Sequence, residues 1–329
     1  MPLAEAEGAI LAHAVDAADP RRPEGPTYRI PKGTRLGADH LRDLAANDVV
    51  RLVVARLGPD DVPEDAAAAR LAAAVAGPGL EVGPAANGRA NLHAAHAGIA
   101  VVDAAAIHAA NLVDPGLTLA TVPPWQRMAP GGLVATLKII PFAVDGGALA
   151  EACAIAAGAL SLRAPQLASA TLVETARDGT PPPDKGRRST AARLTRLGLP
   201  LSDRVVVPHE AGAVAAALRA APGELLLILT ASATSDAHDV APEGLRAAGG
   251  RVIRYGMPVD PGNLLFLGTL GARPVIGLPG CARSPALNGA DWVLERVACG
   301  VPVTGADIAA MGVGGLLKEI PSRPRPREG

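Results

Sequence analysis

The residues best suited to chemistry lie in one short run, Thr230-Ala-Ser-Ala-Thr-Ser-Asp-Ala-His-Asp-Val240. Hydroxyls can donate hydrogen bonds to phosphate oxygens, and small neighbours let a ligand approach the backbone. The candidate hydroxyls are Thr230, Ser232, Thr234 and Ser235. Asp236 and Asp239 are the candidate catalytic residues, and their carboxylates could hold a Mg²⁺ ion that bridges to a phosphate. The structural alternative is that Asp239 caps a helix while the hydroxyls satisfy a turn.

A second run, Arg273–Pro285, has the order of a strand, a tight turn and a helix start. Its apolar residues suit a buried strand, and Pro279 and Gly280 then turn the chain. Ser284 is the predicted N-cap, and Pro285 is the predicted first helical residue. Free N–H groups and the helix dipole at such a start would attract a phosphate or a carboxylate. The alternative is an ordinary turn of an α/β protein.

A third loop, Gly256–Leu264, is predicted between two strands. Its glycines and prolines fix a rigid turn, and Asp260 or Asn263 would face a ligand. Three cations, Lys185, Arg187 and Arg188, precede a predicted helix start at Ser189 and oppose its dipole. An anionic ligand would explain these cations, and a solvated loop would explain them equally well.

Other reactive side chains lack partners at a recognisable spacing. Cys281 and Ser284 have no histidine near them in sequence, so a small buried cysteine and a capping serine are expected. His93 and His96 are spaced as two metal ligands on a helix can be, but no third ligand accompanies them. The three cysteines are far apart and odd in number, which indicates neither a disulfide framework nor a zinc site.

The second half of the chain alternates strands and helices, which would bring these loops together. Strands are expected at residues 170–175, 204–207, 224–229 and 252–255, and in the run that starts at residue 273. Helices are expected at 189–197, at 213–220, from Asp239 to Gly249, and from Ser284 to Gly300. This alternation predicts an α/β fold with a three-layer, doubly wound, mostly parallel sheet that binds ligands at the carboxyl ends of its strands.

Residues 1–163 are predicted to form a mixed α+β domain, with the domain boundary at residues 164–166. Helices are expected at 38–47, 60–75 and 146–162, and a short helix is expected within 88–103. Strands are expected at 49–55, 98–102, 118–122 and 132–142. The second domain would cover 168–320, and the Pro- and Arg-rich residues 321–329 would form a disordered tail.

Composition excludes several classes of partner. The net charge of −1 gives no basic field, and an aromatic content of 2% leaves too few rings to stack on bases, so nucleic-acid binding is not expected. No apolar run is long enough to span a bilayer, and the acidic N-terminus does not resemble a signal peptide. The expected location is the cytoplasm.

The three loops together resemble the molybdopterin-binding domain shared by molybdopterin adenylyltransferases and molybdopterin molybdotransferases. In that family a Gly-Gly-Thr-Gly or Gly-Gly-Val-Ser loop precedes an Asp and often a Thr-Pro-Glu. Here Ser232-Ala-Thr-Ser235 stands at the glycines, and Asp239-Val-Ala-Pro-Glu243 follows. Pro261-Gly262-Asn263 is similar to a Pro-Gly-Lys loop, and Leu278-Pro-Gly-Cys-Ala-Arg-Ser284 to a Leu-Pro-Gly-Asn-Pro-x-Ser motif. Lys32-Gly-Thr-Arg-Leu36 is similar to a segment that precedes the domain in the molybdotransferases.

This resemblance implies a protein that binds molybdopterin or molybdenum cofactor in cofactor biosynthesis or delivery, with Mg²⁺-dependent nucleotidyl or molybdate transfer if it is an enzyme. The implied ligand-binding residues, besides the four hydroxyls, are Pro261, Gly262, Asn263, Pro279, Gly280, Cys281 and Ser284. The glycines and the lysine of the family are replaced, which points to a protein that binds the pterin without transforming it.

Two alternatives remain open. The chain could be a non-catalytic assembly or chaperone subunit for a molybdoenzyme, or a nucleotide-processing enzyme on the same scaffold. The resemblance implies partnership with a molybdoenzyme or a nucleotidyltransferase, and a homo-oligomer, either a dimer or a trimer.

Overall fold

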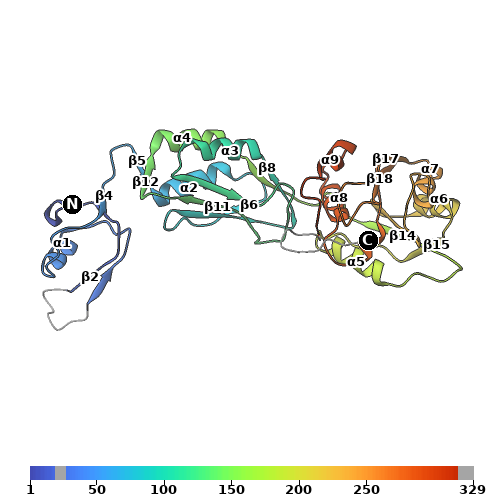
Figure 1. Ribbon diagram of the computed structural model, residues 1–329, viewed down its shortest axis with the longest axis horizontal. Coiled ribbons are helices and arrows are strands. Elements are labelled where there is room, and N and C mark those ends of the chain that lie inside the picture. Colours follow the sequence, from blue (N-terminus) through green and yellow to red (C-terminus); the bar gives the residue numbers. More distant parts are fainter. Residues whose placement is uncertain (19–26, 318–329) are drawn as a thin grey trace. The chain divides into compact units, whose positions relative to one another are not determined.

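The computed structural model describes residues 1–18 and 27–317, which form two compact units (Figure 1). The first unit comprises Met1–Ala95, Ala100–Pro124 and Gly131–Leu162. The second comprises His96–Ile99, Trp125–Pro130 and Arg163–Gly329. The predicted tail at 321–329 lies outside the described residues, as do positions 318–320.

The first unit begins with a small core of its own. Helix α1, Ala38–Ala45, packs there with the 3-10 turn η1, Leu3–Glu5. Two short antiparallel pairs accompany them: β1 (Ile10–Leu11) with β4 (Val54–Ala55), and β2 (Val15–Ala17) with β3 (Tyr28–Ile30). The expected strand at 49–55 is therefore reduced to its last two residues.

A larger core follows, in which three helices pack against an antiparallel sheet (Figure 1). The sheet has the order β6-β7-β11-β9, with β6 Leu80–Val82, β7 Arg89–Ala94, β11 Leu133–Ile139 and β9 Leu117–Thr121. The helices are α2 Glu64–Val75, α3 Ala104–Val113 and α4 Gly146–Ile155. Strand β5 (Asp61–Pro63) pairs with β12 (Ala143–Asp145), so α2 starts later than residue 60.

The helix expected within residues 88–103 is wrong. Strand β7 lies there instead, and its residues alternate between buried and partly exposed because Ala90, Leu92 and Ala94 face the core. His93 therefore lies on a strand, and its predicted helical pairing with His96 does not form. Strand β8, Gly98–Val102, is where the sequence predicted it and pairs with β10, Arg127–Met128.

The second unit is built on a mixed six-stranded sheet of order β15-β14-β16-β19-β18-β17. The strands are β14 Ala170–Ala176, β15 Val205–Pro208, β16 Leu225–Leu229, β17 Arg251–Tyr255, β18 Phe266–Leu270 and β19 Arg273–Gly277. The pairings of β14, β15, β16 and β19 are parallel, but β18 runs antiparallel to both of its neighbours. The expected mostly parallel sheet is thus interrupted by one reversed strand.

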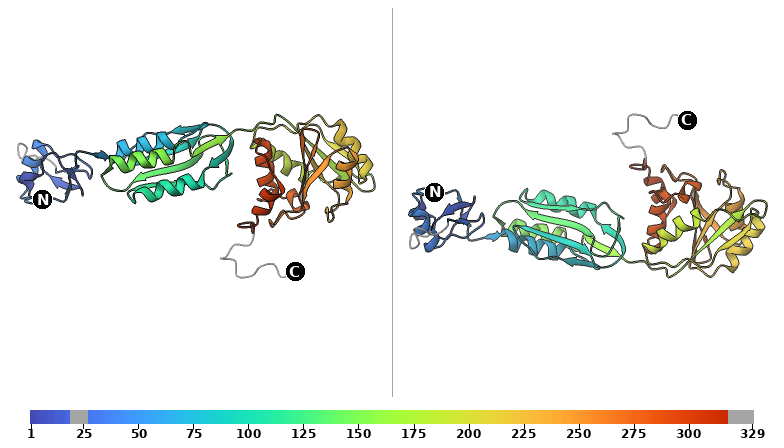
Figure 2. Two further views of the ribbon diagram at one scale, coloured as in Figure 1. Left: turned by 90° about the horizontal axis from the view of Figure 1, so that it is seen from above. Right: turned by 90° about the horizontal axis from the view of Figure 1, so that it is seen from below.

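Helices cover both faces of this sheet (Figure 2). Leu172 and neighbouring residues of one face pack with α5 (Lys185–Thr195), α8 (Gly289–Ala298) and α9 (Gly305–Ala310). Val173 and the opposite face pack with α6 (Ala211–Ala220) and α7 (Val240–Ala247). Because successive strand residues point to opposite faces, the apolar run of β14 contributes to both cores.

Helix α5 begins at Lys185 rather than at the predicted Ser189. Two of the cations in its first turn have partners within the same unit: Arg187 Nη2 donates to Ser202 O at 2.6 Å, and Arg188 pairs with Asp184 at 2.9 Å.

The three cysteines are free. Among residues 1–18 and 27–317, no helix has the length and apolar content needed to cross a membrane.

Candidate functional site at the carboxyl edge of the sheet

All three predicted loops lie at one edge of the six-stranded sheet. Glu174 of β14 pairs with Leu229 of β16, and Ile228 pairs with Gly277 at the end of β19. Phe266, which begins β18, pairs with the same Gly277. Because β17 ends where β18 begins, the loop between them reaches this edge too. We call it the carboxyl edge; it carries loops 230–239, 256–265 and 278–288.

The hydroxyls of loop 230–239 are used largely within the loop. Thr230 Oγ1 donates to Ser232 O at 2.6 Å and lies 3.3 Å from Thr234 Oγ1, and both threonines are buried. Tyr255 Oη donates to Thr234 O at 2.9 Å. Thr230 and Thr234 therefore shape the loop, and the ligand contacts predicted for them and for Ser235 stay predictions.

Both predicted catalytic carboxylates accept backbone N–H groups. Asp239 is the N-cap of α7: its Oδ1 accepts from Val240 N at 2.7 Å, and its Oδ2 accepts from Ser235 N at 3.1 Å. Asp236 Oδ1 accepts from His238 N at 2.7 Å. The capping role of Asp239 is thus confirmed, whereas the catalytic role of either residue stays a prediction.

The described residues give no support for the predicted magnesium ion, which stays a prediction. Mg²⁺ takes a near-octahedral set of oxygen ligands, to which waters and phosphate groups can contribute besides carboxylates. Of the four carboxylate oxygens of Asp236 and Asp239, three already accept N–H groups. Over the described ranges 1–18 and 27–317, no three His, Cys, Asp or Glu side chains are grouped as a metal site would require.

The predicted helix start at Ser284 is wrong. A 3-10 turn, η2 at Gly280–Arg283, follows β19, and Ser284 beyond it is extended. Helix α8 begins only at Gly289, with Asn288 as its N-cap, and its last residue is Ala298, two residues before the predicted stop at Gly300. Cys281, expected to be buried, is exposed.

The N–H groups at the start of α8 already have acceptors. Gly289 N donates to Pro261 O at 2.8 Å, and Ala290 N donates to Asn288 Oδ1 at 3.0 Å. Asp291 N donates to Asn288 O at 2.9 Å. The anion site predicted at this helix start is therefore closed by the protein's own groups.

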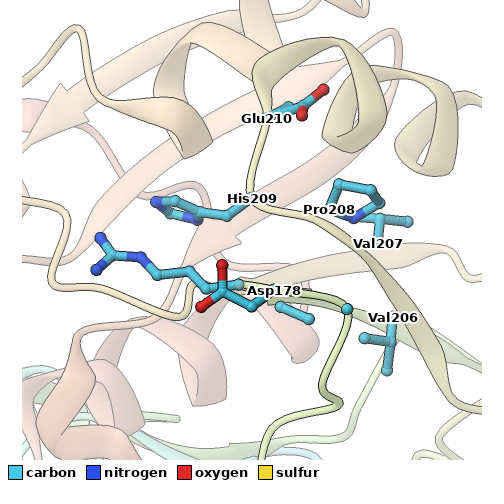
Figure 3. A pocket seen from close by; sticks show the side chains of 9 residues that line it. Asp178, Val206, Val207, Pro208, His209 and Glu210 are labelled. Atoms are coloured by element: carbon cyan, nitrogen blue, oxygen red, sulfur yellow. The ribbon is translucent and has the colours of Figure 1, made fainter.

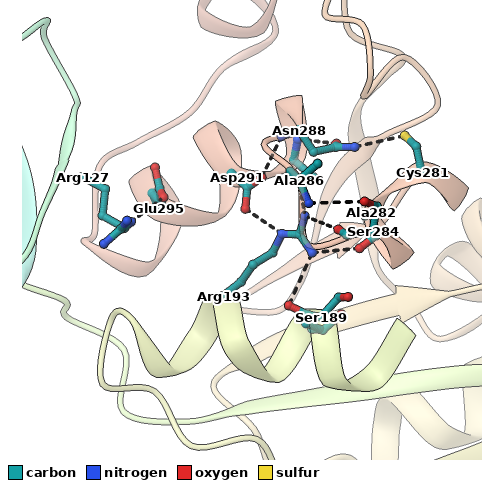
Figure 4. Close-up of polar contacts among 12 residues, drawn as sticks. Arg127, Ser189, Arg193, Cys281, Ala282, Ser284, Ala286, Asn288, Asp291 and Glu295 are labelled. Atoms are coloured by element: carbon teal, nitrogen blue, oxygen red, sulfur yellow. Dashed lines mark hydrogen bonds and ion pairs between the residues drawn. The ribbon is translucent and has the colours of Figure 1, made fainter. Parts of the chain in front are cut away.

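One buried arginine, Arg193 of α5, holds the segment between η2 and α8 (Figure 4). Its Nε donates to Asp291 Oδ1 at 2.6 Å, and its Nη1 donates to Ala282 O at 2.8 Å. Its Nη2 donates to Ser284 O at 2.9 Å and to Ala286 O at 3.0 Å. By binding carbonyls on both sides of the predicted cap, Arg193 stabilises the extended path of this segment in place of the predicted first helical turn.

Residues Pro261, Gly262 and Asn263 lie against the start of α8. Gly262 has a φ of 150°, and a Cβ at this position would lie 3.0 Å from Gly289 Cα, so only glycine fits here. Asn263 Nδ2 lies 3.4 Å from Met257 O, within its own loop. The ligand contacts predicted for Pro261, Gly262, Asn263, Pro279 and Gly280 stay predictions.

Two residues that the sequence analysis did not select complete the edge. His209 follows β15; its Nδ1 lies 2.9 Å from Thr175 Oγ1, and its Nε2 lies 2.9 Å from Ser232 Oγ. Ala231 N donates to the same Thr175 Oγ1 at 2.8 Å. The imidazole thus links the ends of β14, β15 and β16. Position was the signal that could have found these residues, since both stand at the carboxyl ends of predicted parallel strands.

His209 also lines a cleft of about 570 Å³ at the ends of β14 and β15 (Figure 3). Arg177, Asp178 and Glu210 line this cleft as well. Its lining therefore carries charges of both signs and does not favour an anion by itself.

Arg283 of η2 brings a positive charge to the start of loop 230–239. Its Nη2 donates to Thr230 O at 2.6 Å. Glu174, which is buried, is already bound by Arg204 through two contacts of 2.8 and 3.2 Å. Burial lowers the pKa of the Arg283 guanidinium, and Glu174 partly opposes this shift.

Comparisons with known proteins give distant structural likenesses. No family model matches the chain, and no curated protein matches it. The molybdopterin biosynthesis MoeA protein of Pyrococcus horikosii is 14% identical, with 91% of this chain and 75% of that one covered and a TM-score of 0.32. A molybdenum cofactor biosynthesis protein B is 16% identical, with 40% of this chain and 88% of that one covered and a TM-score of 0.28. Because both TM-scores are low, neither likeness assigns a family or a function to this chain.

Proposed function

We propose that this protein binds molybdopterin or molybdenum cofactor at the carboxyl edge and acts as a carrier in cofactor biosynthesis or delivery. One observation carries the proposal. The three loops whose residues resemble the pterin-binding motifs are far apart in sequence, yet all lie at this one edge. Ligands of α/β sheets commonly bind at the carboxyl ends of strands.

The side chains at the carboxyl edge favour binding over transfer chemistry. Asp236 and Asp239 accept backbone N–H groups, and no metal-assisted step is assigned to them. Asn263 stands where the resembling family has a lysine, which removes one charge that would neutralise a phosphate. One cation, Arg283, contacts the start of loop 230–239 through the carbonyl of Thr230.

Isothermal titration of the purified protein with molybdopterin, and separately with its adenylylated form, tests the proposal. A carrier binds with the same affinity in EDTA and in millimolar Mg²⁺. Tighter binding of the adenylylated form that depends on Mg²⁺ would instead support a transferase, and Asp236→Asn and Asp239→Asn would then be the variants to compare. The absence of binding to either pterin would contradict the proposal.

The receiving partner is part of the same proposal. A carrier would hand its ligand to a molybdoenzyme or accept it from a nucleotidyltransferase, and it would function as a homo-oligomer. Co-purification with a molybdoenzyme in the absence of any bound pterin would favour an assembly subunit over a carrier. Hydrolysis of a nucleotide by the pure protein would favour the nucleotide-processing alternative.

A further inference from the structure

The contacts of His209 favour one direction of a hydrogen-bond chain. Thr175 Oγ1 accepts from Ala231 N, so its own proton is free to go to His209 Nδ1 at 2.9 Å. A neutral imidazole that accepts at Nδ1 carries its proton at Nε2. Nε2 then donates to Ser232 Oγ, also at 2.9 Å. This assignment of protons satisfies Thr175 and His209 completely.

Ser232 is the end of this chain. Its Oγ accepts from His209, and the described part of the chain offers no acceptor for the Ser232 hydroxyl proton. Successive hydrogen bonds polarise one another, which strengthens the last donor of a chain. The turn that presents Ser232 is also fixed, because Thr230 Oγ1 donates to Ser232 O at 2.6 Å. A half-exposed hydroxyl is therefore held in place as a donor.

Arg283 brings an uncompensated charge to the same turn. Its guanidinium donates to Thr230 O, two residues before Ser232. It is half-buried, and within residues 1–18 and 27–317 no carboxylate lies within ion-pair distance of it. Glu174 is the carboxylate whose charge acts on the pKa of Arg283, and it is already paired with Arg204. Partial burial of a cation without a counter-charge costs free energy, and a bound anion would offset that cost.

We propose that Ser232 and Arg283 together bind an oxyanion group of the ligand, with Thr175 and His209 as positioning residues that keep the Ser232 hydroxyl pointing outward as a donor. The group that fits is one whose oxygens only accept hydrogen bonds, such as a phosphate or a pyrophosphate. This inference rests on the proposed function in that it takes the carboxyl edge as the binding surface. It moves the anion site from the start of α8 to the end of β16.

Titration of the full-length protein with inorganic pyrophosphate tests the inference. Ser232→Ala and Arg283→Met should each weaken binding by about tenfold to a hundredfold, the usual loss for a hydrogen bond to a charged group. Thr195→Ala removes an exposed hydroxyl in the last turn of α5, outside the three loops of the carboxyl edge, and should change the affinity by less than about twofold. Equal losses in Ser232→Ala and Thr195→Ala, or no pyrophosphate binding by the wild type, would overturn the inference.

The positioning role has its own test. Thr175→Val removes the hydroxyl that sets the His209 tautomer, whereas Thr175→Ser keeps it, so binding should be weakened by Val and restored by Ser. Equal affinity in both variants, with unchanged circular dichroism, would rule out the hydrogen-bond chain.

Molybdopterin titration of the same proteins separates the two proposals. If the wild type and Ser232→Ala bind the pterin equally, only the oxyanion inference fails; if pyrophosphate binds as expected but the pterin does not, only the proposed function fails.

Discussion

At the scale of single residues, burial decides the charge of Glu295. This glutamate of α8 pairs with Arg127 at 3.3 Å, yet burial raises its pKa to about 7 and Asp291 adds to the rise. Arg127, Arg196 and Arg193 oppose the shift without cancelling it. Loss of solvation therefore outweighs three arginines, and Glu295 is only half ionised near neutral pH.

This shift makes stability depend on pH. The pKa of Glu295 rises from 4.5 to about 7 on folding, so the folded state holds the proton longer than the unfolded state. The favourable contribution is complete below pH 4.5 and is lost as the pH rises through 7, a change of about 3 kcal/mol. Glu295→Gln should therefore gain up to about 3 kcal/mol over the wild type between pH 5 and pH 8. Urea unfolding across this range measures it, with Glu151→Gln, an exposed glutamate of α4, as control; a constant difference between Glu295→Gln and wild type would contradict it.

Substitution of Arg193 tests how much its contacts with the segment around η2 stabilise the protein. Arg193→Met leaves the buried Asp291 without its ion-pair partner and removes the hydrogen bonds to four carbonyls, so unfolding should require about 3–5 kcal/mol less free energy. Adding Asp291→Asn removes the stranded charge while keeping an acceptor for Asn288 N, and the double variant should recover part of the loss. Urea midpoints of the single and double variants give the answer. A double variant less stable than Arg193→Met would show that the ion pair is not the cause.

At the scale of elements, the end of β19 depends on a glycine facing an aromatic ring. Phe266 of β18 lies directly opposite Gly277, and a Cβ on Gly277 would lie 1.9 Å from Phe266 Cε1. Gly277→Ala should therefore cost about 1–3 kcal/mol through overpacking, and Phe266→Leu should relieve it. Gly212→Ala in α6 is the matched control, since nothing lies within 4 Å of its Cβ position, and it should be neutral or slightly stabilising. Differential scanning calorimetry of the three variants would contradict this account if both alanine variants melted alike.

The helices and strands differ in how well the sequence predicted them. Alternating strands and helices predicted β14, β15, β16, β17 and α6 close to their observed bounds, because each has a clear apolar run and a turn signal. The reversed direction of β18 had a local signal that the sequence analysis did not use: only two residues separate β18 from β19, whereas parallel neighbours need a much longer connection. The start of α8 involves a non-local contact instead, because Arg193, about ninety residues away, binds the carbonyls of Ser284 and Ala286. At β7 the signal was present, because Ala90, Leu92 and Ala94 alternate as a half-buried strand does.

The sequence likewise identified some residues of the candidate site and not others. Motif spacing selected the loops that the sheet brings to the carboxyl edge, and helix-cap chemistry identified Asp239. Thr175 and His209 belong to no motif, and their importance follows only from the proximity of three strand ends. Side chains that meet only because neighbouring parallel strands end together cannot be recognised from any one segment of the sequence.

At the scale of the whole molecule, the second unit is not a continuous piece of chain. It includes His96–Ile99 and Trp125–Pro130, which lie well before Arg163 in sequence. Ile99 is fully buried in the core beneath β14 and α8, and the Trp125 ring lies 5.5 Å from the Arg296 guanidinium. Arg127 supplies the ion pair to Glu295. A fragment cut at the predicted domain boundary would lose all three contacts.

A fragment of residues 163–329 should therefore be less stable than the same region in the full chain. Loss of a buried isoleucine costs about 2–5 kcal/mol in comparable cores, and loss of the cation–π contact adds about 1 kcal/mol. Urea unfolding of the fragment, followed by the fluorescence of Trp292, should have a lower midpoint than the corresponding transition of a full-length Trp125→Phe protein. Full-length Ile99→Ala should move the midpoint in the same direction. If the fragment and the full chain unfold at the same urea concentration, the early segments contribute nothing to this core, and the carboxyl edge can be studied on the fragment alone.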